Sequence, residues 1–237
     1  MRPKQTFFLF LLLAACYSRD VGPKTSGTEY YPLKVGVYWI YDVTETNITQ
    51  LGGQTASTYQ LKVEVTDSIN DAGQVTYLLH RFTRPDATTP WTATTTWSAR
   101  KSTFEAVLQE GNTPVVILSF PLSEGKTWNG NALNNLGGKD KCIDGTVNCD
   151  NYSVSNLGMR FEFESLFYDN TVSIIENNDA DPIVGKDIRK DVYAAATGLV
   201  YREVTQLQYC TVGDCIGKQI VENGIIIKQS LKDYGAL

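Results

Sequence analysis

The sequence contains a single histidine, His80, and none of the short motifs that mark common catalytic sites. It has no G-x-S-x-G nucleophile elbow, no H-E-x-x-H pair, no phosphate-binding loop and no dinucleotide fingerprint. No two cysteines have the C-x-x-C spacing that is typical of zinc sites. We therefore expect no metal and no other cofactor, and we expect that the protein is not an enzyme.

Clusters of basic residues are also absent. The chain carries 26 Asp and Glu against 21 Lys and Arg, which gives a formal net charge of −5. Nucleic-acid binding needs a basic face that neutralises phosphates. The composition therefore excludes nucleic acid as a partner.

The N-terminus carries an apolar run that is far too short to cross a bilayer. Phe7–Leu13 has seven residues (FFLFLLL), whereas a spanning helix needs roughly 20. Arg2 and Lys4 precede the run, and Ala14-Ala15-Cys16 follows it. This order is typical of a bacterial lipoprotein signal peptide, in which cleavage leaves Cys16 as the lipid-bearing N-terminus. The alternative is an ordinary signal peptide that happens to contain a cysteine.

The lipoprotein reading predicts a location and a domain organisation. Residues 1–15 form the signal peptide, residues 16–30 are a polar, flexible tether, and residues 31–237 form one β domain. Acyl chains such as palmitate on Cys16 anchor the protein in a bacterial envelope membrane. We expect the protein to be anchored in the outer membrane, on either its periplasmic or its surface face.

The remaining cysteines agree with export. An even number of cysteines in an exported chain indicates disulfides. Local pairing is the simplest of the three possible connectivities, and it predicts the disulfides Cys142–Cys149 and Cys210–Cys215.

Apolar side chains recur at every second position over most of the chain. Residues 37–43, 59–66 and 159–165 show this alternation, which is typical of half-buried β-strands. Turn sequences such as Asn223-Gly224 separate the runs. We expect an all-β domain, with one short helix at most, built as a single meandering curved antiparallel sheet or as a half-barrel or sandwich.

Two segments depart from this pattern. Residues 129–158 are rich in Gly, Asn and Asp and have little periodicity, which indicates a long surface loop closed by a disulfide. Asp187–Ala196 is the best candidate for a helix, although it fits a strand almost as well.

Two short blocks resemble elements of known proteins. Residues 31–41 (YPLKVGVYWIY) and 195–203 (AATGLVYRE) resemble the aromatic-Pro-Leu-x-x-Gly-x-x-Trp-x-Tyr opening and the Gly-Leu-Val-x-x-Glu closing element of poorly characterised envelope lipoproteins of the Bacteroidetes type. The resemblance implies one meandering curved sheet and brings no catalytic residues. It implies that Trp39 and Tyr41 point into the core.

Few residues qualify as a site. Trp91 and Trp97 are six residues apart, so an extended strand places both on one face, as a ligand platform if exposed or as core if buried. His80 is expected to be a structural strand residue. Glu162 and Glu164 share a strand face and could form an acid/base pair, but we expect them to be solvent-facing.

Acidic residues also gather in two loops. Oxygen ligands suit calcium, but the spacing does not fit a calcium loop, and Asp and Asn are common turn formers. The residues are Asp140, Asp144, Asn148 and Asp150 in one loop and Asp179 and Asp181 in the other.

Three functions remain open. The first is a non-catalytic, lipid-anchored domain with a binding or structural role. The second is a carrier that holds a hydrophobic ligand in a curved sheet, and the third is an enzyme acting on envelope glycans or peptides. A packed interior argues against the carrier, and dispersed acidic side chains argue against the enzyme.

Overall fold

The computed structural model describes residues 26–50 and 53–237. About two thirds of the described residues lie in strands, and the only helical elements among them are two 3-10 turns, η1 (Thr28–Tyr30) and η2 (Gly213–Cys215). Within the described residues, no helix combines the length and the apolar character needed to cross a membrane. The all-β prediction is confirmed, with no α-helix in the described part of the chain.

One antiparallel sheet of 12 strands contains almost all of the strand residues. From one edge to its middle, the order is β6 (Thr113–Ser119), β5 (Glu105–Glu110), β4 (Thr92–Lys101), β3 (Gln74–Arg84), β2 (Gly53–Asp71) and β1 (Val37–Thr49). It continues with β14 (Val221–Ala236), β13 (Gly198–Tyr209), β12 (Gly185–Ala194), β11 (Leu166–Asp181), β10 (Asn151–Phe163) and β7 (Thr127–Asn129). The short strands β8 (Asp140–Lys141) and β9 (Val147–Cys149) pair separately.

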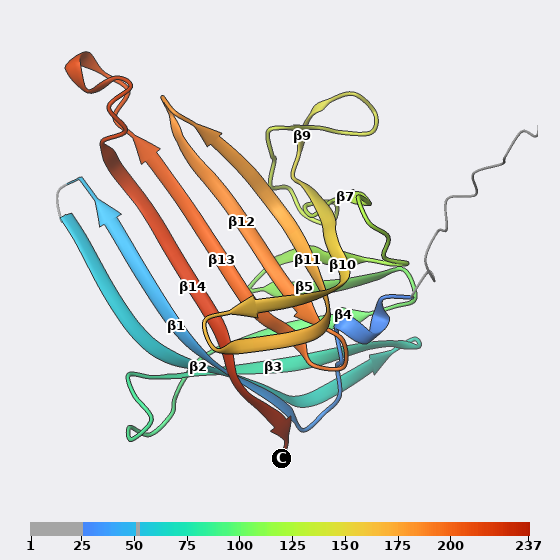
Figure 1. Ribbon diagram of the computed structural model, residues 1–237. Coiled ribbons are helices and arrows are strands. Elements are labelled where there is room, and N and C mark those ends of the chain that lie inside the picture. Colours follow the sequence, from blue (N-terminus) through green and yellow to red (C-terminus); the bar gives the residue numbers. More distant parts are fainter. Residues whose placement is uncertain (1–25, 51–52) are drawn as a thin grey trace, which may run out of the picture.

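The sheet is a meander in which only the pairing of β1 with β14 joins distant parts of the chain. Figure 1 shows β1 and β11–β14 side by side, with β2–β5 curving beneath them. The two edges approach each other, because the Val116 amide of β6 donates to the Gly130 carbonyl just after β7, at 2.9 Å. The Trp128 indole donates to the Val116 carbonyl at 2.8 Å. The sheet is therefore nearly closed into a barrel-like curve.

The alternation of apolar and polar residues decides which side of each strand is buried. In β1, Trp39, Tyr41 and Val43 are buried, while Asp42 and Thr44, on either side of Val43, are exposed. The expected inward direction of Trp39 and Tyr41 is confirmed. On the opposite side of the sheet, the end of the β10–β11 hairpin folds over β13, where the Phe163 ring lies 4.5 Å from Tyr201 (Figure 1).

Three local expectations are wrong. The helix candidate Asp187–Ala196 lies mainly in β12, because its alternate residues pack on both sides of a sheet. Residues 28–30, expected in the tether, belong to the folded domain, since they form η1 and Tyr30 is fully buried. The expected loop 129–158 is shorter, because residues 151–158 belong to β10.

Candidate functional site

A small cavity of about 80 Å³ opens on the concave side of the sheet. Aliphatic side chains from both halves of the sheet form part of its wall, namely Leu61, Val63, Leu79, Leu108, Ile117 and Leu199. Aromatic side chains form most of the rest, namely Tyr31, Trp39, Tyr41, Trp97 and Tyr193. The polar members are Arg81, Arg202 and Gln229. An apolar cavity with a few polar groups is the usual composition of a small-molecule site.

The two sequence blocks singled out above meet at this cavity. The Trp39 indole donates to the Thr197 carbonyl at 2.6 Å, and the Tyr41 hydroxyl donates to the Leu199 carbonyl at 3.2 Å. Gly198 has φ +97°, and a Cβ there would lie 3.3 Å from the Trp39 indole nitrogen. Glycine is favoured here both by its conformation and by this close approach. The two blocks therefore fix one wall of the cavity.

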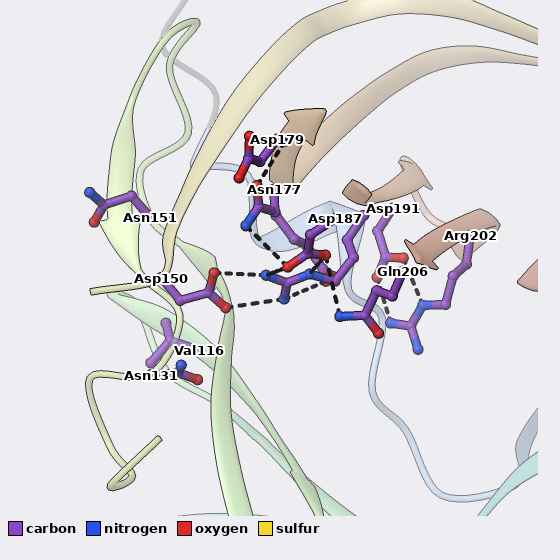
Figure 2. Close-up of polar contacts among 12 residues, drawn as sticks. Val116, Asn131, Asp150, Asn151, Asn177, Asp179, Asp187, Asp191, Arg202 and Gln206 are labelled. Atoms are coloured by element: carbon purple, nitrogen blue, oxygen red, sulfur yellow. Dashed lines mark hydrogen bonds and ion pairs between the residues drawn. The ribbon is translucent and has the colours of Figure 1, made fainter. Parts of the chain in front are cut away.

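Arg202 lies at the polar end of the cavity and is held by Asp191. Its Nε and Nη2 donate to the two carboxylate oxygens at 2.7 and 2.6 Å, and Tyr193 also donates to Asp191. Figure 2 shows the Arg202 side chain directed at Asp191. Burial alone would lower the pKa of Arg202, but Asp191 raises it well above the usual value. Arg202 Nη1 makes no hydrogen bond to the described residues.

A second arginine, Arg189, neutralises the carboxylates farther along the same face. It donates to both oxygens of Asp150, at 2.8 and 3.1 Å, and to Asp187 at 2.9 Å. Asp187, Arg189 and Asp191 occupy alternate positions of β12 and thus face the same side. Figure 2 shows Asp150 and Asp187 converging on this point. A row of alternating charges therefore runs from the open end of the strands to the cavity.

Glu176 is a further carboxyl group beside this row, with a side chain that is 14% exposed. Its Oε2 lies 3.8 Å from Arg189 Nη1. Burial raises the pKa of Glu176 to about 8, helped by the charge of Asp191 and opposed by Arg202 and Arg189. This shift favours the neutral form of Glu176 beside the two ion-paired arginines.

Arg81 differs from these arginines because it has no acceptor. Its guanidinium lies 3.7 Å from the centre of the Trp97 ring, in the wall of the cavity. The Nε atom is shielded from water and has no hydrogen-bond partner among the described residues. No ion pair of Arg81 occurs in that part of the chain. A buried charged donor without an acceptor is rare and costly.

The structure separates the two tryptophans of the expected platform. Trp97 pairs with Leu79 and faces the cavity. Trp91 precedes β4 and lies under Arg84, at 4.1 Å from ring centre to guanidinium. It also contacts Lys62, whose neighbours Leu61 and Val63 face the cavity, so Trp91 lies on the other side of the sheet. The expectation of one shared face is wrong, because a β-bulge after Arg81 shifts the alternation by one residue.

Other residues singled out in the sequence lie apart from the cavity. His80 pairs with Glu64 and, as the neighbour of Leu79 and Arg81, points to the opposite side. Glu162 forms an exposed ion pair with Arg160. Glu164 follows β10 in a turn with φ +53°, so it does not share a strand face with Glu162.

The acidic loop residues are used locally. Asp144 accepts from Thr146, Asp181 accepts from two amides of its own turn, and Asp150 binds Arg189. Across residues 26–50 and 53–237, no three His, Cys, Asp or Glu side chains are placed to hold a metal ion. These acidic residues are thus dispersed over separate elements.

The structure contains the disulfides Cys142–Cys149 and Cys210–Cys215, with Cα–Cα distances of 5.3 and 5.8 Å. Both close short loops near the ends of the strands (Figure 1). Cys16 lies outside the described residues.

Sequence reasoning missed Arg81, Arg202 and Asp191. Arg81 alternates with Tyr77 and Leu79, and a charge in such an apolar row was the available signal. Asp187, Arg189 and Asp191 also alternate, but this pattern usually marks a solvated face. Only the tertiary structure shows that both sets face the concavity.

Comparison with known proteins places the chain near no described family. No family model and no curated protein matches it. A candidate exported protein from Bacteroides fragilis with a YmcC-like fold has 13% identity and a TM-score of 0.41, covering 86% of this chain and 98% of its own. A candidate lipoprotein from Parabacteroides distasonis has 11% identity and a TM-score of 0.37, with coverages of 87% and 98%.

Proposed function

We propose that this protein is a lipid-anchored component of a bacterial envelope, in the outer membrane, whose β domain binds a small ligand without chemical conversion. The proposal of a lipid anchor is supported by the lipoprotein-type signal sequence that precedes Cys16, and the two disulfides fit an exported domain. The binding role rests on one observation, the aromatic-lined cavity on the concave side with guanidinium groups in its wall.

The size of the cavity limits the ligand. Its volume of about 80 Å³ accommodates several water-sized groups, at roughly 10–15 Å³ for each. A long acyl chain needs more room, so the cavity favours a short ligand or the end of a larger one. Glu162, Glu164 and the loop aspartates lie on separate elements, which supports binding over glycan or peptide hydrolysis.

Lipid anchoring predicts a clear result for Cys16→Ala. In a bacterial host grown with labelled palmitate, the wild-type chain becomes labelled and sediments with membranes. The variant loses its only acylation site and is expected to carry no label. A Cys142→Ala/Cys149→Ala variant is the control, because it removes two cysteines and keeps Cys16. Equal labelling of the wild type and Cys16→Ala contradicts the anchor.

Occupancy of the cavity predicts that Val63→Phe abolishes ligand binding. Val63 lines the cavity, and a phenyl ring there fills most of the space. Wild-type protein purified without detergent is expected to show a bound small-molecule mass in native mass spectrometry, or a thermal shift with members of a small-molecule library. Ile69→Phe, on the same strand but 55% exposed, is expected to behave like the wild type. The absence of both signals from the wild type, or their persistence in Val63→Phe, contradicts the binding function.

A further inference from the structure

Building on the proposed binding function, we infer that the cavity recognises the carboxylate group of its ligand through Arg81, with Arg202 as a second donor. The ligand is then a small organic acid whose carboxylate lies at the two guanidinium groups and whose apolar part lies among the aliphatic and aromatic walls.

The first support is the contrast between Arg81 and three other arginines of the sheet. Arg84 donates to Gln60 at 2.8 Å, and Arg189 and Arg202 each hold an aspartate at 2.6–2.8 Å. Arg81 stacks on Trp97 with its Nε shielded and unbonded. The terminal N–H groups of Arg81 also have no acceptor among the described residues, and an acceptor in the cavity would meet these groups rather than the shielded Nε.

The second support is the charge balance at the cavity. Asp191 accepts hydrogen bonds from Arg202 and Tyr193, and it makes no contact with Arg81 among the described residues. Glu110 lies near enough to raise the pKa of Arg81, but it forms neither an ion pair nor a hydrogen bond with it. Arg202 lowers the pKa of Arg81, which shows that the two cations feel each other. Arg81 therefore has no carboxylate in direct contact, and Glu110 compensates its charge only at a distance.

The third support is the fit of a carboxylate to the donors. A guanidinium presents parallel N–H groups that match the two oxygens of a carboxylate. Trp97 holds the plane of Arg81 by stacking, which leaves its edge free for such a bidentate contact. Arg202 Nη1 and the Gln229 amide are the other polar groups of the same wall.

The test compares acids with their uncharged isosteres. Binding of sodium benzoate, sodium hexanoate, benzamide, hexanamide and inorganic phosphate is measured by calorimetry and by tryptophan fluorescence, since Trp39 and Trp97 line the cavity. The wild type is expected to bind a carboxylate at least about tenfold more tightly than the matching amide, which corresponds to about 1.4 kcal/mol. In R81Q this preference is expected to fall to about twofold or less.

Two further variants separate recognition from structure. R84Q removes an arginine that stacks on Trp91 on the other side of the sheet, and it is expected to keep the wild-type preference. R81M retains the apolar stem over Trp97, and its unfolding temperature is expected to stay within about 2 °C of the wild type, because no acceptor is lost. A large drop in unfolding temperature for R81M means that Arg81 serves the fold and contradicts the inference.

The outcomes also distinguish this inference from the function on which it rests. Equal binding of acids and amides by the wild type contradicts carboxylate recognition but does not contradict ligand binding in the cavity. Tighter binding of phosphate than of either acid overturns the carboxylate in favour of another oxyanion. If no probe binds and no bound mass or thermal shift is found for the wild type, the proposed function fails as well.

Discussion

Replacing Asp191 by alanine is expected to lower the free energy of unfolding by about 3 kcal/mol. The Asp191 side chain is only 2% exposed, and it holds Arg202 through two short hydrogen bonds. Its removal leaves the Arg202 charge without a partner and the Tyr193 hydroxyl without an acceptor. The loss is expected at the lower end of the range of about 3–5 kcal/mol for broken buried pairs, because Arg202 remains 23% exposed.

Urea unfolding monitored by circular dichroism measures this effect. The control is Glu162→Gln, which breaks the exposed Arg160–Glu162 pair with its N–O distance of 2.8 Å. That variant is expected to change stability by less than about 0.5 kcal/mol, since exposed pairs gain little from their charges. Similar losses of unfolding free energy in Asp191→Ala and Glu162→Gln would contradict the role of Asp191 as a buried partner of Arg202.

A double variant tests the origin of the loss. If the cost in Asp191→Ala comes from the stranded Arg202 charge, Arg202→Met in the same chain is expected to recover part of it. Additive losses would instead assign the effect to packing around Asp191. Comparing Asp191→Ala with the double variant therefore also tests whether Arg202 is tolerated at the cavity because Asp191 compensates its charge.

The fold class followed from the sequence because each strand obeys a local rule. Trp39, Tyr41 and Val43 alternate with polar residues, and burial follows that alternation in the structure. The sequence predicts a tight hairpin turn at Asn223-Gly224. In the structure both residues lie inside β14 and pair with β1 or β13. Pairing across the sheet thus overrides a local turn preference.

The binding site could not be predicted in the same way, because it depends on curvature and register. Arg81 and Arg202 are 121 positions apart in the chain and reach one cavity only when the sheet curls and β1 pairs with β14. The β-bulge opposite Arg81 and Phe82 adds one residue to β4, Thr94, and this extra residue places Trp91 and Trp97 on different sides of the sheet. A single extra residue in one strand leaves no clear mark in composition or periodicity.

The boundary between tether and domain was also misplaced, because a short buried turn has no periodicity. Residues 28–30 form η1, and the Glu29 carbonyl accepts from the Ala196 amide. Lys101 of β4 donates to the Thr28 and Tyr31 carbonyls at 3.0 and 2.7 Å. This turn therefore bridges β4 and the β12–β13 turn, on opposite halves of the sheet.

Tyr30→Ala is accordingly expected to be the other strongly destabilising change, with a loss of about 3–5 kcal/mol. The Tyr30 ring is fully buried, and its hydroxyl donates to the Asn170 side chain at 2.7 Å. Alanine leaves a cavity the size of an aromatic ring between the two halves. Tyr30→Phe keeps the ring and loses one hydrogen bond, so a loss of about 1 kcal/mol is expected.

The same variant connects the packing of this turn to ligand binding. Tyr31 follows Tyr30 directly, lines the cavity and contacts Tyr193 edge to face at 6.3 Å. If η1 holds Tyr31 in place, Tyr30→Ala is expected to weaken carboxylate binding while Tyr30→Phe leaves it unchanged. A loss of unfolding free energy below about 1 kcal/mol in Tyr30→Ala, measured by urea unfolding, would contradict this role of η1. Residues 26–30 would then not stabilise the domain, and η1 would not hold Tyr31 in the cavity wall.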